Sequence, residues 1–222
     1  MLGNQEKPWS CRRHLAIAAL VVLAPLLTVL AKQESSVVDA DPFPLTRCVI
    51  SDSVLDRKAE VFDDDGREIR VCCEKCVDEF NEERDSRVVE IDEKIVEQQG
   101  EYYPLDKCVV DAKPGEGFGL LDVVFRNRLF RVCRKECQKK LEKTPEKYFI
   151  RLDRAVIEEQ KPDYPLTTCV VSGKMLGKEA IDHVVANQLV RLKDSDQLER
   201  FDQTPGKYLE ELRKAARKKA DK

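Results

Sequence analysis

The chain has 222 residues, and its charged fraction of 36% leaves modest apolar content for one large core, which favours several small modules. Lys plus Arg (39) nearly balance Asp plus Glu (42). The resulting formal net charge of -3 excludes a general electrostatic attraction to nucleic acid or to an acidic membrane surface, and no nucleic-acid partner is expected.

The N-terminus has the pattern of an export signal or a membrane anchor. Basic residues at positions 12–14 precede an almost unbroken apolar run from Leu15 to Ala31. This order is typical of a secretory signal that is cleaved after Ala31. The run is long for such a signal and shorter than the about 20 residues of a membrane span. We therefore expect residues 1–31 to form an apolar helix that is a signal peptide or a membrane anchor, with residues 15–31 contacting the membrane. The protein is then exported, to the periplasm or the cell surface.

One short motif occurs three times after residue 40. It reads aromatic-Pro-Leu-x-x-Cys followed by two aliphatic residues, and its cysteines are Cys48, Cys108 and Cys169. The intervals between them are 60 and 61 positions, as tandem repeats require. The sequence thus predicts three modules of similar length, at residues 41–99, 101–160 and 162–217.

Each module continues with the pattern of a β-hairpin. Apolar and polar residues alternate on either side of Asp65-Gly66 in the first module, of Asn127 in the second and of Asn187 in the third. Asp-Gly and Asn are favoured in the tight turns of hairpins. The predicted strand residues are 60–62 with 69–71, 123–125 with 129–132, and 184–185 with 189–192.

Helices are predicted after each hairpin. Thr144-Pro145 and Thr204-Pro205 occupy equivalent places, where threonine caps and proline begins a helix. Apolar residues then recur at helical spacing and indicate core positions: Tyr148, Phe149, Leu152 and Val156, then Tyr208, Leu209, Leu212 and Ala216, and more loosely Val88, Ile91 and Ile95. Residues 98–100 and 160–163 are interpreted as linkers between the modules.

The first two modules carry further cysteines directly after the hairpin. Cys72 and Cys76 match Cys133 and Cys137, so the shared element is Cys-x3-Cys at a strand end where a helix begins. Side chains four positions apart on a helical turn point the same way, and the front loop can add a third thiol.

Three converging thiolates form most of a soft metal site. Zinc and copper are the ions expected, because thiolate ligands suit Zn(II) and Cu(I). A tetrahedral zinc needs a fourth ligand, for which the sequence offers Cys73 in the first module and Asp111 or Glu136 in the second, with water or an incoming ligand as alternatives. Neither His14 nor His183 belongs to these sites.

The combination of Tyr-Pro-Leu-x-x-Cys, the later Cys-x3-Cys and Thr-Pro-x-Lys-Tyr resembles the TRASH and YHS-like family of small metal-binding modules over almost all of the chain after residue 40. The resemblance implies an α+β fold of three tandem treble-clef-like modules, each a β-hairpin plus helix, that bind heavy metals, often copper. It also implies two ligand sets: Cys48, Cys72 and Cys76, and Cys108, Cys133 and Cys137.

The third module departs from this pattern. Cys169 is present, but Lys193 and Gln197 stand where the paired cysteines belong, so this module cannot form the site. Its retained turn and helix motifs predict that it keeps the fold and acts as a cap or a docking surface for a protein partner.

Two other functions compete with metal binding. In an exported protein nine cysteines permit a disulfide-stabilised interaction protein, although the four and three thiols of the first two modules are not both even sets. Cys73-x-x-Cys76 is formally a redox motif, but the second module has Arg134 in place of Cys73 and no βαβ pattern surrounds it. A non-enzymatic protein is therefore expected, with thiol-disulfide oxidoreductase activity as the least favoured alternative.

Overall fold

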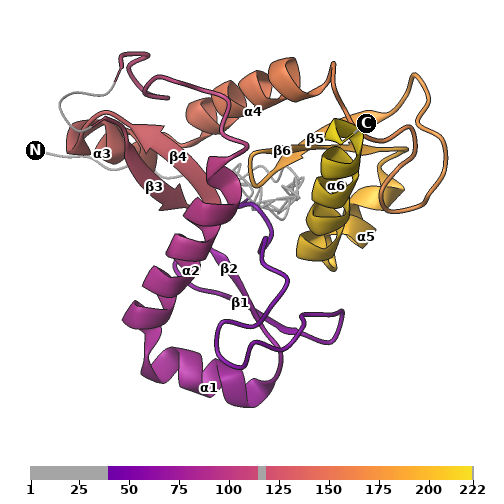
Figure 1. The fold of residues 1–222 in the computed structure, drawn as a ribbon. Coiled ribbons are helices and arrows are strands. Elements are labelled where there is room, and N and C mark those ends of the chain that lie inside the picture. Colours follow the sequence, from indigo (N-terminus) through magenta and orange to yellow (C-terminus); the bar gives the residue numbers. More distant parts are fainter. Residues whose placement is uncertain (1–39, 115–118, 222) are drawn as a thin grey trace, which may run out of the picture. The chain divides into compact units, whose positions relative to one another are not determined.

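The computed structural model describes residues 40–114 and 119–221 (Figure 1). The predicted signal or anchor at residues 1–31 lies outside the described residues. Within the described ranges, no helix has both the length and the apolar character needed to cross a membrane.

The architecture mixes small two-stranded antiparallel sheets with helices. We call residues 41–99, 101–160 and 162–217 the first, second and third segments; in the described part of the chain each contains one hairpin followed by two helices. The elements are β1 (Glu60–Asp63), β2 (Glu68–Val71), α1 (Glu74–Glu82), α2 (Arg84–Gly100), β3 (Leu121–Phe125), β4 (Arg128–Val132), α3 (Lys135–Lys143), α4 (Glu146–Gln160), β5 (Ile181–Val185), β6 (Gln188–Leu192), α5 (Asp196–Asp202) and α6 (Pro205–Ala220).

The three hairpins form where the turn residues predict them. Register partners include Val61 with Arg70, Val123 with Phe130 and His183 with Val190. At the tip of each hairpin two successive residues have positive φ: Asp65 and Gly66, Arg126 and Asn127, and Ala186 and Asn187. Two left-handed residues in a row are the geometry of the tight turn whose twist matches that of the strands.

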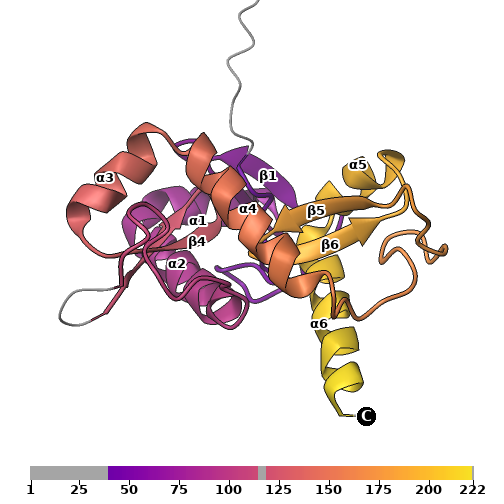
Figure 2. The same ribbon diagram turned by 90° about the horizontal axis from the view of Figure 1, so that it is seen from above.

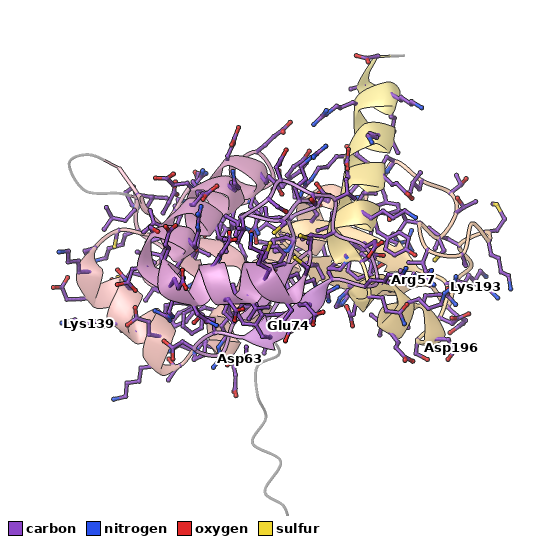
Figure 3. All side chains as sticks on the ribbon, turned by 90° about the horizontal axis from the view of Figure 1, so that it is seen from below. Arg57, Asp63, Glu74, Lys139, Lys193 and Asp196 are labelled. Atoms are coloured by element: carbon purple, nitrogen blue, oxygen red, sulfur yellow. The ribbon has the colours of Figure 1, made fainter. Side chains whose placement is uncertain are left out.

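The helix that follows each hairpin directly is amphipathic. α1 buries Cys76 and Phe80, and α3 buries Cys137 and Leu141, four positions apart in both cases. Charged residues cover the other faces, as Figure 3 shows for Glu74 and Lys139. A cysteine therefore lies on the core side of each of these helices, one turn before the apolar residue that anchors the helix.

Each segment has its own apolar cluster. Fully buried Phe80 and Ile91 belong to the first, Phe130 and Leu152 to the second, and Phe201 with its neighbours to the third. The helical faces expected from the spacing are buried, with Val88 and Ala216 only partly so. Separate clusters of this size agree with the limited apolar content of the chain.

The second helix of a segment also packs on the next hairpin. Val96 of α2 joins the core beneath β3 and β4, and Val156 of α4 packs with Val184 and Leu189 of β5 and β6. Figure 2 shows α4 lying alongside that hairpin. Neighbouring segments thus bury apolar surface against each other and are not independent modules joined only by linkers.

The interpretation of residues 98–100 and 160–163 as linkers is wrong for residues 98–100, which belong to α2, and for Gln160, which ends α4. Gln99 is fully buried near the end of α2, donates to the Asn127 carbonyl (2.9 Å) and accepts from the Leu129 amide (2.8 Å). Gln160 makes the same two hydrogen bonds to the third hairpin: it donates to the Asn187 carbonyl (2.9 Å) and accepts from the Leu189 amide (2.8 Å). Each of these side-chain amides satisfies one donor and one acceptor of the following hairpin. From composition alone, the same glutamines look like part of a polar linker.

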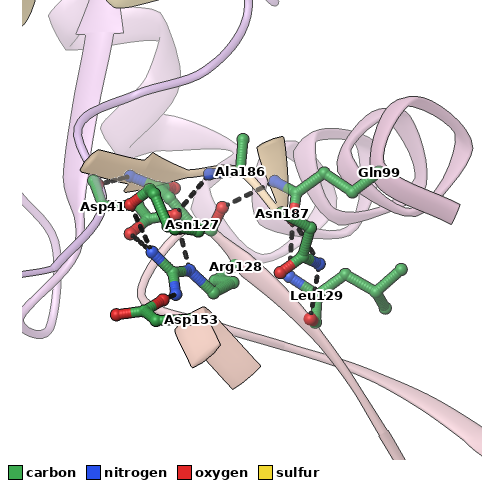
Figure 4. A network of polar contacts seen from close by, with 9 residues as sticks. Asp41, Gln99, Asn127, Arg128, Leu129, Asp153, Ala186 and Asn187 are labelled. Atoms are coloured by element: carbon green, nitrogen blue, oxygen red, sulfur yellow. Dashed lines mark hydrogen bonds and ion pairs between the residues drawn. The ribbon is translucent and has the colours of Figure 1, made fainter. Parts of the chain in front are cut away.

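A buried ion pair joins the three segments (Figure 4). Two of the guanidinium nitrogens of Arg128, Nε and Nη2, donate to the carboxylate of Asp41 at 2.8 and 2.6 Å, and the Arg128 and Asp41 side chains are 2% and 5% exposed. Arg128 also donates to Asp153 and to the carbonyl oxygen of Val184 (2.8 Å). Asp41 in turn accepts from the Ala186 amide (2.6 Å). Although burial opposes it, the Asp41 carboxylate raises the pKa of Arg128 above its ordinary value, so the cation is fully retained.

The third segment docks onto the front loop of the first. Arg70 of β2 donates to the carbonyl oxygens of Asp202 and Gln203 (2.6 Å for the latter), at the end of α5. At the start of α6 the backbone of Gly206 lies against Leu45 so closely that a Cβ atom there would be 2.5 Å from the Leu45 carbonyl oxygen. The loop that leads to Cys48 is thus held from outside by the segment that lacks the paired cysteines.

Candidate metal centres

The front cysteines lie on three loops of the same backbone design. The amides of Cys48, Cys108 and Cys169 each donate to the carbonyl five positions later, at 2.9, 2.8 and 2.8 Å. Their carbonyls each accept from the amide four positions later, and that residue has positive φ in every loop. The repeated turn folds the loop around its cysteine, and all three thiols are buried.

The paired cysteines are placed by the junction of a strand and a helix. Cys72 follows β2 and Cys76 lies in the first turn of α1, with their sulfur atoms 3.6 Å apart. Cys133 and Cys137 occupy the same places after β4 and in α3, again 3.6 Å apart. Extended residues at 73 and 134 turn the chain into the helix, and their carbonyls accept the amides of Cys76 and Cys137 (3.0 Å).

Each pair meets the thiol of its own front loop. The sulfur atoms of Cys48, Cys72 and Cys76, which we call the first centre, all lie within 4.8 Å of one another. The same holds for Cys108, Cys133 and Cys137, the second centre. Zinc–sulfur bonds of about 2.3 Å separate the sulfurs of a tetrahedral site by about 3.8 Å. The two sulfur triads therefore have the size that one ion bound by three thiolates requires.

The polar neighbours of the two centres differ. At the first centre the Ser51 hydroxyl is 3.1 Å from the Cys72 sulfur, and the Cys73 sulfur is 3.7 Å from that of Cys72 and 3.6 Å from that of Cys76. Cys73 is exposed, and its sulfur is not among those that lie within 4.8 Å of one another. The first centre thus has a further thiol beside two of its three members.

At the second centre a carboxylate replaces this thiol. Cys137 donates to Asp111 Oδ2 at 3.3 Å, and the same carboxylate pairs with Arg134 (2.5 Å) and Lys140 (3.5 Å). Glu136, the other candidate from the sequence, has a side chain 72% exposed and lies 3.9 Å from Arg134. Asp111 therefore borders the second centre, whereas Glu136 faces solvent.

The protonation of the thiols follows from their surroundings. Burial, and then the shared hydrogen bonds of neighbouring groups, raises the pKa of Cys76 and of Cys137 well above that of an ordinary thiol. Cys108 is also buried, yet the backbone amides of Asp111 and Cys133 lower its pKa. The hydrogen bond from Cys137, with the charges of Lys140 and Arg134, lowers the pKa of Asp111. A metal ion bound at either centre displaces thiol protons, because only thiolates are ligands.

The third segment keeps the loop and lacks the centre. Lys193 and Gln197 occupy the positions of the paired cysteines, and both contact Asp194, at 3.7 and 3.0 Å. Figure 3 shows Lys193 on this segment. His183 packs edge-on against the Phe201 ring, with centroids 5.9 Å apart. Among the described residues only the two triads were found to group potential ligand atoms this closely.

Comparisons of the chain with known protein families, with curated proteins and with solved structures find no match. Three soft donors that converge from a loop and a helix start suit a thiophilic metal ion, and the cysteines of the described residues are free thiols.

The sequence identified the six cysteines and offered Asp111 as a candidate ligand, but it did not reveal that Ser51 and the ion pair of Arg134 with Asp111 border the centres. Ser51 and Asp111 occupy the same position, three residues after the front cysteine, and Ser172 is their equivalent in the third segment. Aligning the repeats at this position shows a change from serine to aspartate that coincides with the change from Cys73 to Arg134. That paired change is the signal that identifies the Asp111–Arg134 ion pair.

Proposed function

We propose that this chain is a non-enzymatic metal-binding protein that holds one soft ion, Zn(II) or Cu(I), at each of the two centres. The observation that carries the proposal is the convergence of three sulfur atoms within 4.8 Å at both places, from segments 60 positions apart in the sequence. Thiolate ligands at this spacing are the donors that these ions prefer.

The third segment supports the proposal by contrast. It keeps the front loop, the hairpin and both helices, but both post-hairpin cysteines are replaced together. Loss of the two residues as a unit is what a shared ligand role predicts. Gly206 of this segment instead packs against the loop of the first centre, and the carbonyls of Asp202 and Gln203 accept from Arg70 of β2, which supports the role of a cap.

Membership of the TRASH and YHS-like family, with three treble-clef-like modules, belongs to the same proposal. Its support is the triple motif and the common order of loop, hairpin and helices. Export, with residues 15–31 at a membrane, rests on the apolar run alone. A protein partner at the third segment rests on its retained fold.

A disulfide-stabilised interaction protein is the second candidate. The 3.6 Å separation of the sulfurs in each Cys-x3-Cys pair favours it, since small side-chain movements bring such atoms to the bonding distance of about 2.05 Å. The two candidates differ in the number of thiols and of bound ions per chain. A metal centre keeps reactive thiols and an ion, whereas a disulfide keeps neither.

Native mass spectrometry of the full chain purified without chelator separates them. We expect two ions per chain, one ion in Cys76→Ser, one in Cys137→Ser and none in the double variant, because each substitution removes the sulfur of its triad that the helix holds against the other two. Cys169→Ser is the matched control and keeps two ions, since its segment has no paired cysteines. Metal content that is unchanged in the double variant contradicts the proposal, as does a metal-free chain whose mass shows oxidised cysteines.

A further inference from the structure

The two centres differ at a pair of positions whose side chains contact the paired cysteines. The first position follows the front cysteine by three residues and the second precedes the helix by one. The first centre has Ser51 and Cys73 there, and the second has Asp111 and Arg134. The donor that stands beside Cys76 is thus a helix-cap thiol, and the donor beside Cys137 is a loop carboxylate.

We propose that the centres have different complete ligand sets: Cys73 supplies a fourth thiolate at the first, and Asp111 supplies an oxygen at the second. This inference rests on the proposed metal-binding function and extends it to the fourth position of each site. It assigns four sulfurs to one ion and three sulfurs with one carboxylate oxygen to the other.

The geometry at the first centre supports a fourth thiolate. The sulfurs of Cys72, Cys73 and Cys76 form a triangle with sides of 3.7, 3.6 and 3.6 Å, close to the edge of about 3.8 Å for a zinc tetrahedron. Cys48 lies within 4.8 Å of two of these atoms and provides the remaining corner. Cys73 stands outside the group of mutually close sulfurs, so a site with four thiolates requires its exposed side chain to move toward Cys48 when the ion binds.

The second centre has no thiol to use in this way, because the equivalent of Cys73 is Arg134. Its guanidinium binds Asp111 and also lies 3.7 Å from the sulfur of Cys133. Lys140 reaches the other oxygen of Asp111. These two cations hold the carboxylate beside Cys137 and offset the negative charge that three thiolates and a carboxylate bring to a divalent ion.

A difference in metal preference follows from the ligand sets. Four thiolates favour the softest ions, whereas a carboxylate oxygen shifts a site toward harder ones. We therefore expect Cu(I) to concentrate at the first centre when copper and zinc compete, with Zn(II) retained at the second. The two positions that differ would then separate two ions within one chain.

Cobalt(II) spectroscopy tests this assignment, since the sulfur-to-cobalt charge-transfer absorption increases with the number of thiolates bound. Full-length protein with Cys133→Ser and Cys137→Ser reports on the first centre alone, and protein with Cys72→Ser and Cys76→Ser on the second. Adding Cys73→Ser to the first background should lower the absorption per bound cobalt by about a quarter, as one of four thiolates is lost. The same substitution in the second background is the matched control and should change nothing.

Asp111→Asn in the second background should leave the charge-transfer absorption unchanged, shift the ligand-field bands and weaken cobalt binding by at least about tenfold. The assignment is overturned if Cys73→Ser leaves the absorption at the first centre unchanged, or if Asp111→Asn leaves the ligand-field bands of the second centre unchanged. In either case metal binding by the triads stands. Absence of any charge-transfer absorption in both backgrounds overturns the metal-binding function and the assignment together.

Discussion

Replacing Arg128 by leucine is expected to lower the free energy of unfolding by about 3–5 kcal/mol, as measured by urea denaturation of the full chain. The substitution leaves the Asp41 carboxylate, 5% exposed, without the two hydrogen bonds that now compensate its charge. It also removes the donor to the Val184 carbonyl. An unpaired charge at that depth costs far more than the loss of a surface contact.

Arg84→Leu is the control for this prediction, because the arginine side chain of its ion pair with Asp64 is 44% exposed, against 2% for Arg128. Solvent screens such pairs, and the midpoint of denaturation should barely move. Adding Asp41→Leu to Arg128→Leu should recover part of the lost stability, since the uncompensated charge is then gone. Equal effects of Arg128→Leu and Arg84→Leu would show that the buried pair does not bind the three segments together.

The second large effect is expected for Gly206→Ala. A Cβ atom at this position meets the Leu45 carbonyl oxygen at 2.5 Å and the Pro44 carbonyl oxygen at 2.9 Å, and both are backbone atoms that cannot rotate away. Overpacking of this kind typically costs about 1–3 kcal/mol, and the two backbone contacts place this substitution toward the upper end, above the about 1 kcal/mol by which alanine improves on glycine inside a helix.

Thermal unfolding of Gly206→Ala and Gly177→Ala gives the comparison. Gly177 has no heavy atom within 4 Å of an added Cβ, so its replacement should be neutral. A Gly206→Ala protein as stable as the parent would mean that α6 does not pack on the front loop of the first segment. The contact is of interest because that loop carries Cys48.

The sequence predicts the hairpin turns and the cysteine pairs well, but the expected capping is wrong, because neither Thr144 nor Thr204 caps its helix through its side chain. Asp65-Gly66, Asn127 and Asn187 specify turns with two left-handed residues, and all three hairpins form at these points. The spacing of the cysteines places each pair at a strand end and helix start, as observed. Turn chemistry and helical spacing act over a few residues, so a linear pattern is enough to identify them.

The features that the sequence does not reveal depend on contacts across segments. Gln99 looks like part of a polar linker, yet its amide has partners about 30 positions away in the chain. Arg128 directly follows a turn and is of a residue type that is usually exposed, but Asp41 and the third segment enclose it. Burial of a polar side chain is decided by the partners that fold against it, which no local pattern encodes.

The repeats also show which parts of the fold are independent of the paired cysteines. The loop around Cys169 has the same hydrogen bonds as those around Cys48 and Cys108, although Lys193 and Gln197 replace the two other sulfurs. Backbone bonds therefore suffice to shape the loop. The paired cysteines are not needed for that shape, which is the behaviour expected of residues retained for a ligand.

X-ray absorption at the metal edge of the purified full-length protein tests metal binding by the triads most directly. Sulfur neighbours at about 2.3 Å, three or more for each ion, are the expected result, because the triads offer only sulfur from their three members. A shell made only of oxygen and nitrogen at about 2.0–2.2 Å would contradict it, since the ion would then be bound elsewhere on the chain.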